Sequence, residues 1–373
     1  MDALAITPGI PWSVHHRRLA APRMDAVADG RGVRVRVLRA GLCGTDAEVA
    51  SGAFGHGPPG DDFLVIGHEH LGEIVEVGPG VDDPALQPGR LVVASNRRPG
   101  RSAWDRVGLQ DFTADDDTLE RGIRGLHGFL VEEYVDDPAF LTPVPDLLAE
   151  TGVLMEPMSV IEKGLAQVAA VQRRLHIWEP AHAIVVGAGT IGLLAVLALR
   201  LRGLSVTCWS RRPAPHRNAA LVTAAGARYV SAAETDLPGL VAAEGRADLV
   251  VEASGAAELV YPSALALAPN GVLLLTSVTA AARVVPVDLA AWNQAFVLWN
   301  RAMVGTVNAA RVDFAAAVGT LARAEAELPG WAAGLITHRI PGLDPDAVRD
   351  RLRERGDAIK AVVEVGPRGS AAR

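Results

Sequence analysis

The hydrophobic pattern of the chain changes character near Leu147. Before that point, Val33–Leu38 alternates apolar and basic residues, as a strand with one exposed face does. Short apolar runs follow at Leu71–Val77 and Leu91–Ala94, separated by turns rich in glycine and proline. Because few long helical patterns occur before residue 150, this part is predicted to be a compact, mainly β domain.

After Leu147, strand-like and helix-compatible segments alternate. Glu150–Val171 has a helical composition, and alanine-rich segments such as Arg217–Ala225 and Ala256–Ala268 separate the apolar runs. Such alternation is typical of a doubly wound parallel sheet with helices between its strands. The six strands expected in this sheet are Ala183–Val186, Ser205–Ser210, Ala227–Val230, Asp248–Ala253, Gly271–Ser277 and Met303–Val307.

The end of the chain returns to helix at Val312–Leu328 and Asp344–Arg355, and it closes with the strand-like run Ile359–Val365. We expect this last strand to rejoin the first domain. The predicted fold class is therefore α/β. It combines a mainly β domain, residues 1–165 and 309–373, with a doubly wound domain, residues 166–308.

A glycine motif lies between the first strand of the doubly wound domain and helix-forming Leu193–Arg202. In Gly187-x-Gly189-x-x-Gly192, the first glycine permits a tight turn, the second lets backbone approach a pyrophosphate, and the third lets the helix pack closely. Free N–H groups and the dipole at the helix start favour a bound phosphate. The motif predicts a dinucleotide site, with expected cofactor contacts at Gly187, Gly189, Thr190, Ile191, Gly192 and Ser277.

The second strand of this domain indicates which nicotinamide cofactor is bound. It ends Cys208-Trp-Ser-Arg-Arg212, and no Asp or Glu occurs between residues 205 and 230. NAD sites place an acidic residue here for the ribose 2′-hydroxyl, whereas hydroxyls and arginines suit the 2′-phosphate of NADP. Ser210, Arg211 and Arg212 therefore predict NADP(H), with a solvated basic turn and the use of NAD(H) as alternatives.

Composition limits the class of protein further. Of 373 residues, 49% are hydrophobic and 21% charged, and the net charge of −7 argues against a general nucleic-acid surface. Two cysteines exclude a disulfide framework and fit a reducing compartment. The uncharged stretch Ala183–Leu199 is short for a membrane span, and residues 1–18 carry no signal-peptide core. We expect a cytoplasmic protein with no nucleic-acid or membrane partner.

Candidate metal ligands precede the doubly wound domain: Cys43, His68, Glu69 and Glu156. A thiolate, an imidazole and carboxylates can form a catalytic Zn²⁺ shell that leaves a position for water or substrate. Asp46 is a candidate to orient the histidine. Taken singly, such residues are more often packed or solvated groups, and Cys208 is expected to be a packing residue. Their combination beside a dinucleotide motif favours a metal site.

Several motifs together resemble the zinc-dependent medium-chain dehydrogenase/reductase superfamily. They are Gly41-Leu-Cys-Gly-Thr-Asp46, Gly67-His-Glu69 with Gly72-Glu-Ile-Val-Glu-Val-Gly78, and Val185-Val-Gly-Ala-Gly-Thr-Ile-Gly192. Motifs similar to its glucose 1-dehydrogenase branch are Asn96-Arg-Arg-Pro99, Glu120-Arg-Gly-Ile123, Leu154-Met-Glu-Pro-Met-Ser-Val-Ile-Glu-Lys163 and Asp357-Ala-Ile-Lys360. The resemblance covers nearly the whole chain. It implies a GroES-like catalytic domain, a Rossmann domain and an active site in the cleft between them.

The resemblance also implies roles for single residues. Cys43, His68 and Glu69 match zinc-ligand positions, Glu156 matches a fourth, exchangeable ligand, and Thr45 matches a residue that relays the alcohol proton. Further polar residues fall where the branch contacts its sugar, and turn chemistry is the alternative for the two asparagines among them. The expected substrate contacts are Thr45, Glu69, Asn96, Glu120, Glu156 and Asn308. A homodimer or homotetramer is implied as well.

Two features depart from the family pattern. The structural zinc lobe of the superfamily offers four close cysteines between about residues 97 and 120, and this chain has none there. One catalytic zinc and no structural zinc are expected, with the lobe held by packing that includes Trp104 and with Asp115–Asp117 as a solvated turn. Just before Asn308, apolar Val297-Leu298-Trp299 stands where the branch often presents a histidine, which puts glucose itself in doubt.

The predicted function is zinc-dependent hydride transfer between an alcohol carbon of a sugar or polyol and NADP(H). The alternative substrate is a cyclitol, an aminocyclitol or another alcohol of secondary metabolism. The alternative from a different class is a nucleotide-binding protein without catalysis, because some relatives of this fold lack zinc. Retention of the whole candidate ligand set speaks against that last alternative.

Overall fold

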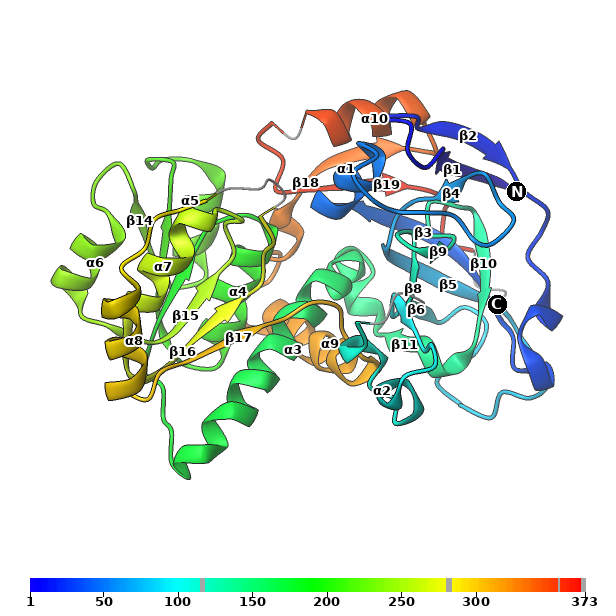
Figure 1. Ribbon diagram of the computed structural model, residues 1–373. Coiled ribbons are helices and arrows are strands. Elements are labelled where there is room, and N and C mark those ends of the chain that lie inside the picture. Colours follow the sequence, from blue (N-terminus) through cyan, green and yellow to red (C-terminus); the bar gives the residue numbers. More distant parts are fainter. Residues whose placement is uncertain (115–117, 280–283, 355, 370–373) are drawn as a thin grey trace. The chain divides into compact units, whose positions relative to one another are not determined.

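The computed structural model describes residues 1–114, 118–279, 284–354 and 356–369, and the chain divides into two compact units (Figure 1). The first unit comprises Met1–Ser159, Asn308–Glu325 and Ala332–Arg373. The second unit comprises Val160–Val307 and Ala326–Trp331.

The first unit is built on three β-sheets. The strands of its large sheet are Val33–Leu42 (β3), Glu69–Val77 (β5), Leu91–Ala94 (β6), Glu133–Asp136 (β10), Leu141–Val144 (β11), Ile336–Pro341 (β18) and Lys360–Glu364 (β19). Their order is β11-β6-β5-β3-β19-β18, and β10 also pairs with β3. β19 runs antiparallel to β3, with Ala361 opposite Leu42. The last strand of the chain therefore rejoins the first domain, as expected.

Two small sheets and several helices complete the described part of this unit. The small sheets contain Asp2–Ile6 (β1), His15–Arg18 (β2) and Leu64–Val65 (β4), and then Arg97–Arg98 (β7), Leu119–Arg121 (β8) and Gly125–Leu126 (β9). The α-helices are Gly44–Ala50 (α1), Ala103–Arg106 (α2), Pro345–Arg353 (α10) and parts of Met155–Gln172 (α3) and Arg311–Glu327 (α9). Alternation along β3 buries Val33, Val35 and Val37 in the core of the unit.

The second unit is a doubly wound sheet. Its strands are His182–Val186 (β12), Ser205–Ser210 (β13), Arg228–Ser231 (β14), Ala247–Glu252 (β15), Leu267–Leu275 (β16) and Ala302–Gly305 (β17). Its helices are Thr190–Leu201 (α4), Arg217–Ala224 (α5), Leu237–Glu244 (α6), Ala257–Leu265 (α7) and Leu289–Leu298 (α8). The strands are parallel in the order β14-β13-β12-β15-β16-β17, so the order reverses between β12 and β15. α4 packs with α5, whereas α6, α7 and α8 form a second group.

All six predicted strands of this sheet are present, but some elements were missed. β16 begins at Leu267, four residues before the predicted start at Gly271. Helices were expected between the strands, but no bounds were predicted for α6 and α8, because proline and glycine follow the start of α6 and α8 is apolar on several faces. α8 contains no buried residue, so burial against a core does not define its pattern.

The lobe that lacks the four cysteines corrects one expectation. Trp104 is 54% exposed, so packing of this ring does not hold the lobe. Polar contacts do so instead: Asp105 accepts the Ser102 N–H at 2.8 Å and the Thr113 hydroxyl at 2.9 Å. Arg97 donates to the Thr113 carbonyl at 2.6 Å. Charge-assisted hydrogen bonds thus fix the loop. The predicted turn at Asp115–Asp117 lies outside the described residues.

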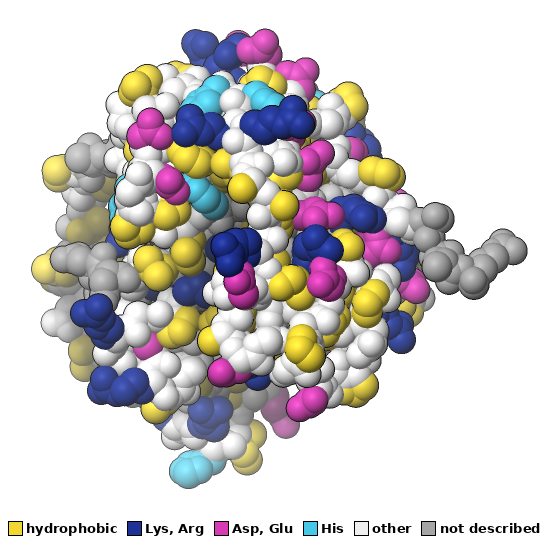
Figure 2. Space-filling view, turned by 90° about the vertical axis from the view of Figure 1, so that its right-hand side faces the viewer, with side chains coloured by type: hydrophobic (Ala, Val, Ile, Leu, Met, Phe, Trp, Pro, Cys, Tyr) yellow, Lys and Arg dark blue, Asp and Glu magenta, His cyan; other side chains and the backbone are white. Residues whose placement is uncertain are grey.

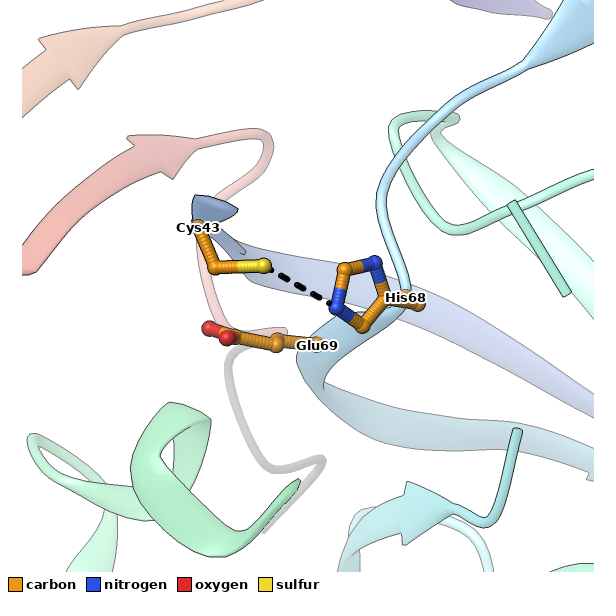
Figure 3. Close-up of side chains that lie close together, drawn as sticks. All are labelled: Cys43, His68 and Glu69. Carbon is orange, nitrogen blue, oxygen red and sulfur yellow. Dashed lines mark hydrogen bonds between the residues drawn. The ribbon is translucent and has the colours of Figure 1, made fainter. Parts of the chain in front are cut away.

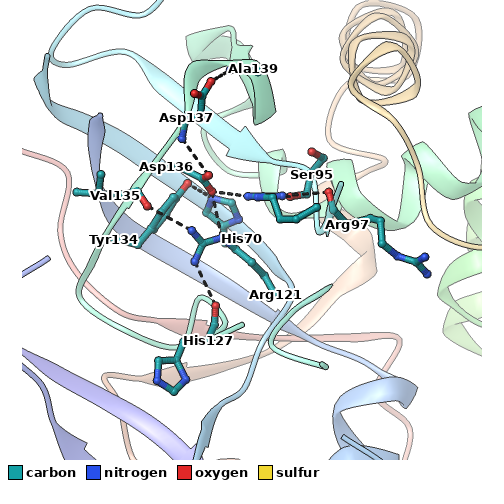
Figure 4. A network of polar contacts seen from close by, with 11 residues as sticks. His70, Ser95, Arg97, Arg121, His127, Tyr134, Val135, Asp136, Asp137 and Ala139 are labelled. Carbon is teal, nitrogen blue, oxygen red and sulfur yellow. Dashed lines mark hydrogen bonds and ion pairs between the residues drawn. The ribbon is translucent and has the colours of Figure 1, made fainter. Parts of the chain in front are cut away.

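A buried network of charged and aromatic residues lies elsewhere in the first unit (Figure 4). Arg98 and Arg121 both donate to the carboxylate of Asp136, the latter at 3.0 Å. His70 Nε2 shares a hydrogen bond of 2.7 Å with the Tyr134 hydroxyl. Burial lowers the pKa of His70 to about 3, so its imidazole is neutral at physiological pH.

Candidate functional site

Three predicted zinc ligands converge in the first unit. The ligand atoms of Cys43, His68 and Glu69 all lie within 4.8 Å of one another (Figure 3). The Cys43 Sγ atom is 3.2 Å from His68 Nε2, and both His68 and Glu69 are buried. A sulfur, a nitrogen and a carboxylate oxygen therefore meet in one place.

Local hydrogen bonds and capping orient the side chains of Cys43 and His68. Cys43 follows β3 and caps the N-terminus of α1, where its Sγ accepts the Thr45 N–H at 3.3 Å. The Cys43 N–H in turn donates to Asp46 Oδ2 at 2.9 Å. Because Asp46 is fixed in this way, its other oxygen faces His68, which precedes β5.

Asp46 holds the far side of the His68 ring. His68 Nδ1 lies 3.2 Å from Asp46 Oδ1, but both buried atoms lack an aligned hydrogen bond. Burial lowers the pKa of His68, yet Cys43 and Asp46 outweigh burial, and the net pKa is raised well above its ordinary value. Burial raises the pKa of the Cys43 thiol despite the nearby imidazole. With Nδ1 turned toward Asp46, Nε2 is the nitrogen left for a metal.

Lys360 is a site residue that sequence reasoning missed. Its Nζ donates to Glu69 Oε1 at 2.7 Å and to the second carboxylate oxygen, and the side chain is 2% exposed. Burial lowers the pKa of Lys360, but Glu69 outweighs burial and the net pKa is raised. Gly41 leaves room for this pair, because a Cβ at Gly41 would lie 2.0 Å from Glu69 Oε2. The only signal in the sequence was the family-like run Asp357–Lys360.

Glu156 does not belong to the 4.8 Å group. Its Oε1 accepts a hydrogen bond from Asn96 Nδ2 at 2.8 Å, while the buried Oδ1 of Asn96 has no hydrogen-bond partner. Burial raises the pKa of Glu156 to about 7, against the lowering effect of His68. The imidazole of His68 therefore affects the pKa of Glu156. The role of Glu156 as a fourth zinc ligand stays a prediction.

The residues present fit a zinc ion. Cysteine sulfur, histidine nitrogen and carboxylate oxygen are its usual ligands, and three of them leave one coordination position open. The unaligned, buried pair of His68 and Asp46 fits the carboxylate–histidine arrangement that orients metal-bound imidazoles.

The other predicted substrate contacts have different surroundings. Thr45 is half-buried beside Cys43. The buried carboxylate of Glu120 accepts from Arg97 Nε at 3.1 Å. Asn308 has a φ of 56°, a left-handed conformation that asparagine adopts more readily than most residues, so turn chemistry stays an alternative explanation of its identity. Contact of these side chains with a sugar stays a prediction.

The glycine turn of the second unit has space for a phosphate. A Cβ at Gly192 would lie 2.0 Å from the Gly187 carbonyl oxygen, so close packing requires the third glycine. At Gly189, by contrast, a Cβ would have no protein atom within 4 Å. Gly189 is the N-cap of α4, and the N-terminus of a helix attracts anions. The turn therefore fits the pyrophosphate of a dinucleotide.

The turn after β13 presents the residues expected at the 2′-phosphate. Ser210 is half-buried, whereas Arg211 and Arg212 are exposed. The Arg211 carbonyl accepts the Ser231 hydroxyl at 3.3 Å, which holds the backbone of the turn. Ser277 lies after β16 and donates to Glu252 Oε2 at 2.6 Å. Cofactor contact of these side chains stays a prediction.

On the face shown in Figure 2, basic and acidic side chains are interspersed rather than gathered by sign. Within the described residues, no helix has the length and apolar character that crossing a membrane requires.

Comparisons with known proteins agree with this geometry. Residues 29–146 match the alcohol dehydrogenase GroES-like domain, and residues 149–365 match the glucose dehydrogenase C-terminus. Glucose 1-dehydrogenase of Methanocella arvoryzae is 38% identical over 98% of this chain and 100% of the relative. Glucose 1-dehydrogenase of Thermoproteus tenax is also 38% identical, over 98% of this chain and 99% of its own.

Solved structures show the same likeness. Haloferax mediterranei glucose dehydrogenase, in complex with NADP, Zn and gluconolactone, superposes with a TM-score of 0.87 at 32% identity, covering 98% of this chain and all of that one. Galactitol-1-phosphate dehydrogenase of Escherichia coli, at 23% identity and a TM-score of 0.78, shares the fold. The chain therefore belongs to the glucose dehydrogenase family of zinc-dependent medium-chain dehydrogenases/reductases.

Proposed function

We propose that this enzyme transfers a hydride between an alcohol carbon of a sugar or polyol and NADP(H), with a catalytic zinc ion in the first unit. The observation that carries the proposal is the convergence of Cys43, His68 and Glu69. The open glycine turn supports a dinucleotide, and the NADP, Zn and gluconolactone of the Haloferax relative support the same cofactors and a sugar-like substrate here.

In this proposal, different residues of the first unit bind the zinc and orient its ligands. Cys43, His68 and Glu69 hold the zinc, which when bound supplies a Lewis acid that lowers the pKa of the substrate hydroxyl. Asp46 orients the imidazole of His68, and Lys360 orients the carboxylate of Glu69.

Other side chains act on the substrate. Thr45 passes the alcohol proton outward, and Glu156 serves as an exchangeable fourth ligand. Asn96, Glu120 and Asn308 bind further hydroxyl groups of the sugar. The unpartnered Asn96 Oδ1 supports this role, because a buried acceptor favours a donor from the ligand.

Metal analysis tests the zinc assignment. We propose one zinc per chain, because the lobe that binds a second zinc in relatives here relies on polar contacts of Arg97, Asp105 and Thr113. A purified enzyme with two zinc ions per chain contradicts this proposal, and so does undiminished turnover after zinc removal.

Two substitutions test the cofactor site. Gly189→Val adds a side chain where no protein atom lies nearby, so we expect a raised KM for NADP⁺ with only the loss of stability that a less favourable N-cap residue causes. Gly192→Ala is the matched control, since its Cβ meets the Gly187 carbonyl and lowers stability itself. Arg211→Asp should raise the KM for NADP⁺ much more than that for NAD⁺. Equal effects on both cofactors contradict the preference for NADP.

A cyclitol, aminocyclitol or other modified alcohol is the second candidate substrate. It is favoured by the apolar run Val297–Trp299, which stands where the branch often offers a histidine. Turnover with a panel of aldoses, polyols and cyclitols, each with NADP⁺ and NAD⁺, discriminates the candidates. The highest kcat/KM on glucose rejects the second one.

We also propose a homodimer or homotetramer in a reducing, cytoplasmic compartment. β17 forms an edge of its sheet, and nearby Leu298 and Met303 are exposed apolar residues that a second copy would cover. Cys43 and Cys208 are both free thiols. Sedimentation equilibrium tests the assembly, and a monomer at micromolar concentration contradicts it.

A further inference from the structure

A buried carboxylate stands at the end of a central strand in the second unit. Glu252 is the last residue of β15 and is 1% exposed. It accepts hydrogen bonds from the Ser254 N–H at 2.8 Å, from the Ser254 hydroxyl, and from the Ser277 hydroxyl at 2.6 Å. Ser277 Oγ in turn accepts the Gly255 N–H at 2.9 Å. One side chain thus ties the loop after β15 to the loop after β16.

These loops lie beside the glycine turn. Glu252 is paired with Val186, the residue that ends β12 and immediately precedes Gly187. A Cβ at Gly187 would lie 2.8 Å from the Ala253 carbonyl oxygen and 3.1 Å from Ser254 Cα, so the β15 loop packs directly on the turn. The strand order reverses between β12 and β15. Ligands of doubly wound sheets bind outside the carboxyl ends of the strands at such a point.

The stability of the fold does not by itself explain why a glutamate occupies position 252. The residues opposite it on both neighbouring strands, Val186 and Leu275, are apolar. A carboxylate in such a place loses its hydration and depends on hydrogen bonds to recover it, so an apolar residue would serve the fold as well. What the carboxylate adds is a fixed geometry for Ser254 and Ser277.

We propose that Glu252 is a positioning residue for the nicotinamide cofactor. Through Ser254 and Ser277 it fixes the two loops that wall the dinucleotide site next to Gly187. Ser277 then acts through its bonds to Glu252 and Gly255. This inference rests on the proposed function, because it assigns the loops to the same NADP(H) site.

Direct cofactor binding tests the proposal in the full-length, zinc-loaded enzyme. NADPH fluorescence titration gives Kd without turnover, and steady-state kinetics give KM for NADP⁺ and kcat separately. For Glu252→Ala we expect both Kd and KM to rise about tenfold, with the KM for the alcohol unchanged. Glu252→Gln retains an oxygen for Ser254 and should recover part of the affinity. Glu244→Gln is the control: this carboxylate accepts the Thr207 hydroxyl at 2.7 Å and touches neither loop residue named here.

Each outcome decides the proposal. A merely structural role lowers the folded fraction while leaving Kd and KM unchanged, and that result overturns it. If Glu252→Ala does not fold, Ser254→Ala decides, because it removes a hydroxyl that Glu252 holds and that is not among the expected cofactor contacts, and it should raise Kd about threefold or more. Failure of the wild-type enzyme to bind NADPH refutes the proposed function. Wild-type binding with unaffected variants refutes only the role of Glu252.

Discussion

Two buried polar clusters in the first unit differ in how their groups are matched. In the network of Figure 4, the Asp136 carboxylate meets two guanidinium groups. Arg98 also donates to the Ser95 carbonyl, and Arg121 donates to the carbonyls of His127 and Val135. The charged groups of this network are thus matched within the protein.

The ligand group of Figure 3 is matched less completely. Cys43, His68 and Glu69 all bring electron-pair donors to one place. Of these, Glu69 has a cationic partner in Lys360, but the buried Oδ1 of Asp46 and Nδ1 of His68 lack aligned hydrogen bonds. Buried groups in such an arrangement are costly unless a further cation or proton satisfies them. The comparison separates a cluster whose charges are matched within the fold from one whose donor atoms fit a metal ion.

The largest expected effect removes the sulfur ligand. Cys43→Ala should lower kcat/KM by ~10³-fold or more, because the Lewis acid is lost together with its charge stabilisation. Zinc content by mass spectrometry should fall, while the urea midpoint of the zinc-free protein stays near that of wild type. Retained activity in a variant free of zinc would refute the metal assignment.

The matched network should respond in the opposite way. Asp136→Asn leaves Arg98 and Arg121 buried without their counter-charge, so the free energy of unfolding should fall by about 3–5 kcal/mol. Activity per folded molecule and zinc content should remain those of the wild type. Urea unfolding measures the free energy of unfolding, and active-site titration measures the activity per folded molecule. A variant with wild-type stability that loses zinc would contradict the division of roles between the two clusters.

The glycine turn and the candidate ligand group differ in how well the sequence alone predicts them. The strand, the glycines and the helix of the glycine turn follow one another directly in the sequence. The geometry of the turn was therefore predictable. The candidate zinc ligands Cys43, His68 and Glu69 were singled out by their chemistry beside a dinucleotide motif and by their match to family motifs. Their spacing in the sequence is irregular and has no local periodicity.

Lys360 and Glu252 show what sequence reasoning missed. Lys360 reaches Glu69, 291 residues earlier in the chain, because β19 and β5 both pair with β3. Glu252 owes its role to the loop after β16, and nothing beside it in the sequence reveals Ser277 as a partner. Trp104 misled because a large aromatic residue in a lobe without cysteines suggested packing, whereas a capped turn left the ring in solvent.

A smaller effect is expected behind the ligand group. Asp46→Asn keeps the shape of the side chain but removes the charge that orients His68, which should weaken zinc binding by about 10–100-fold. Competition with a chelator of known affinity measures this change. Asp105→Asn in the cysteine-free lobe is the control, because that carboxylate also caps a helix but holds no candidate ligand. An equal loss of zinc in both variants would point to general destabilisation.

The smallest effect is the acid sensitivity of the matched network. Burial raises the pKa of Asp136, but Arg121 and Arg98 outweigh burial, and the net pKa lies below its ordinary value of 3.8. A carboxyl group whose pKa is lower in the folded state adds stability above its unfolded pKa, and that stability is lost as pH falls through the folded pKa. Urea midpoints of the wild type should therefore fall below about pH 4 more steeply than those of Asp136→Asn. If the urea midpoints of both proteins change in parallel with pH, the charge of Asp136 does not contribute to stability. The matched network would then differ from the ligand group only in its hydrogen bonds.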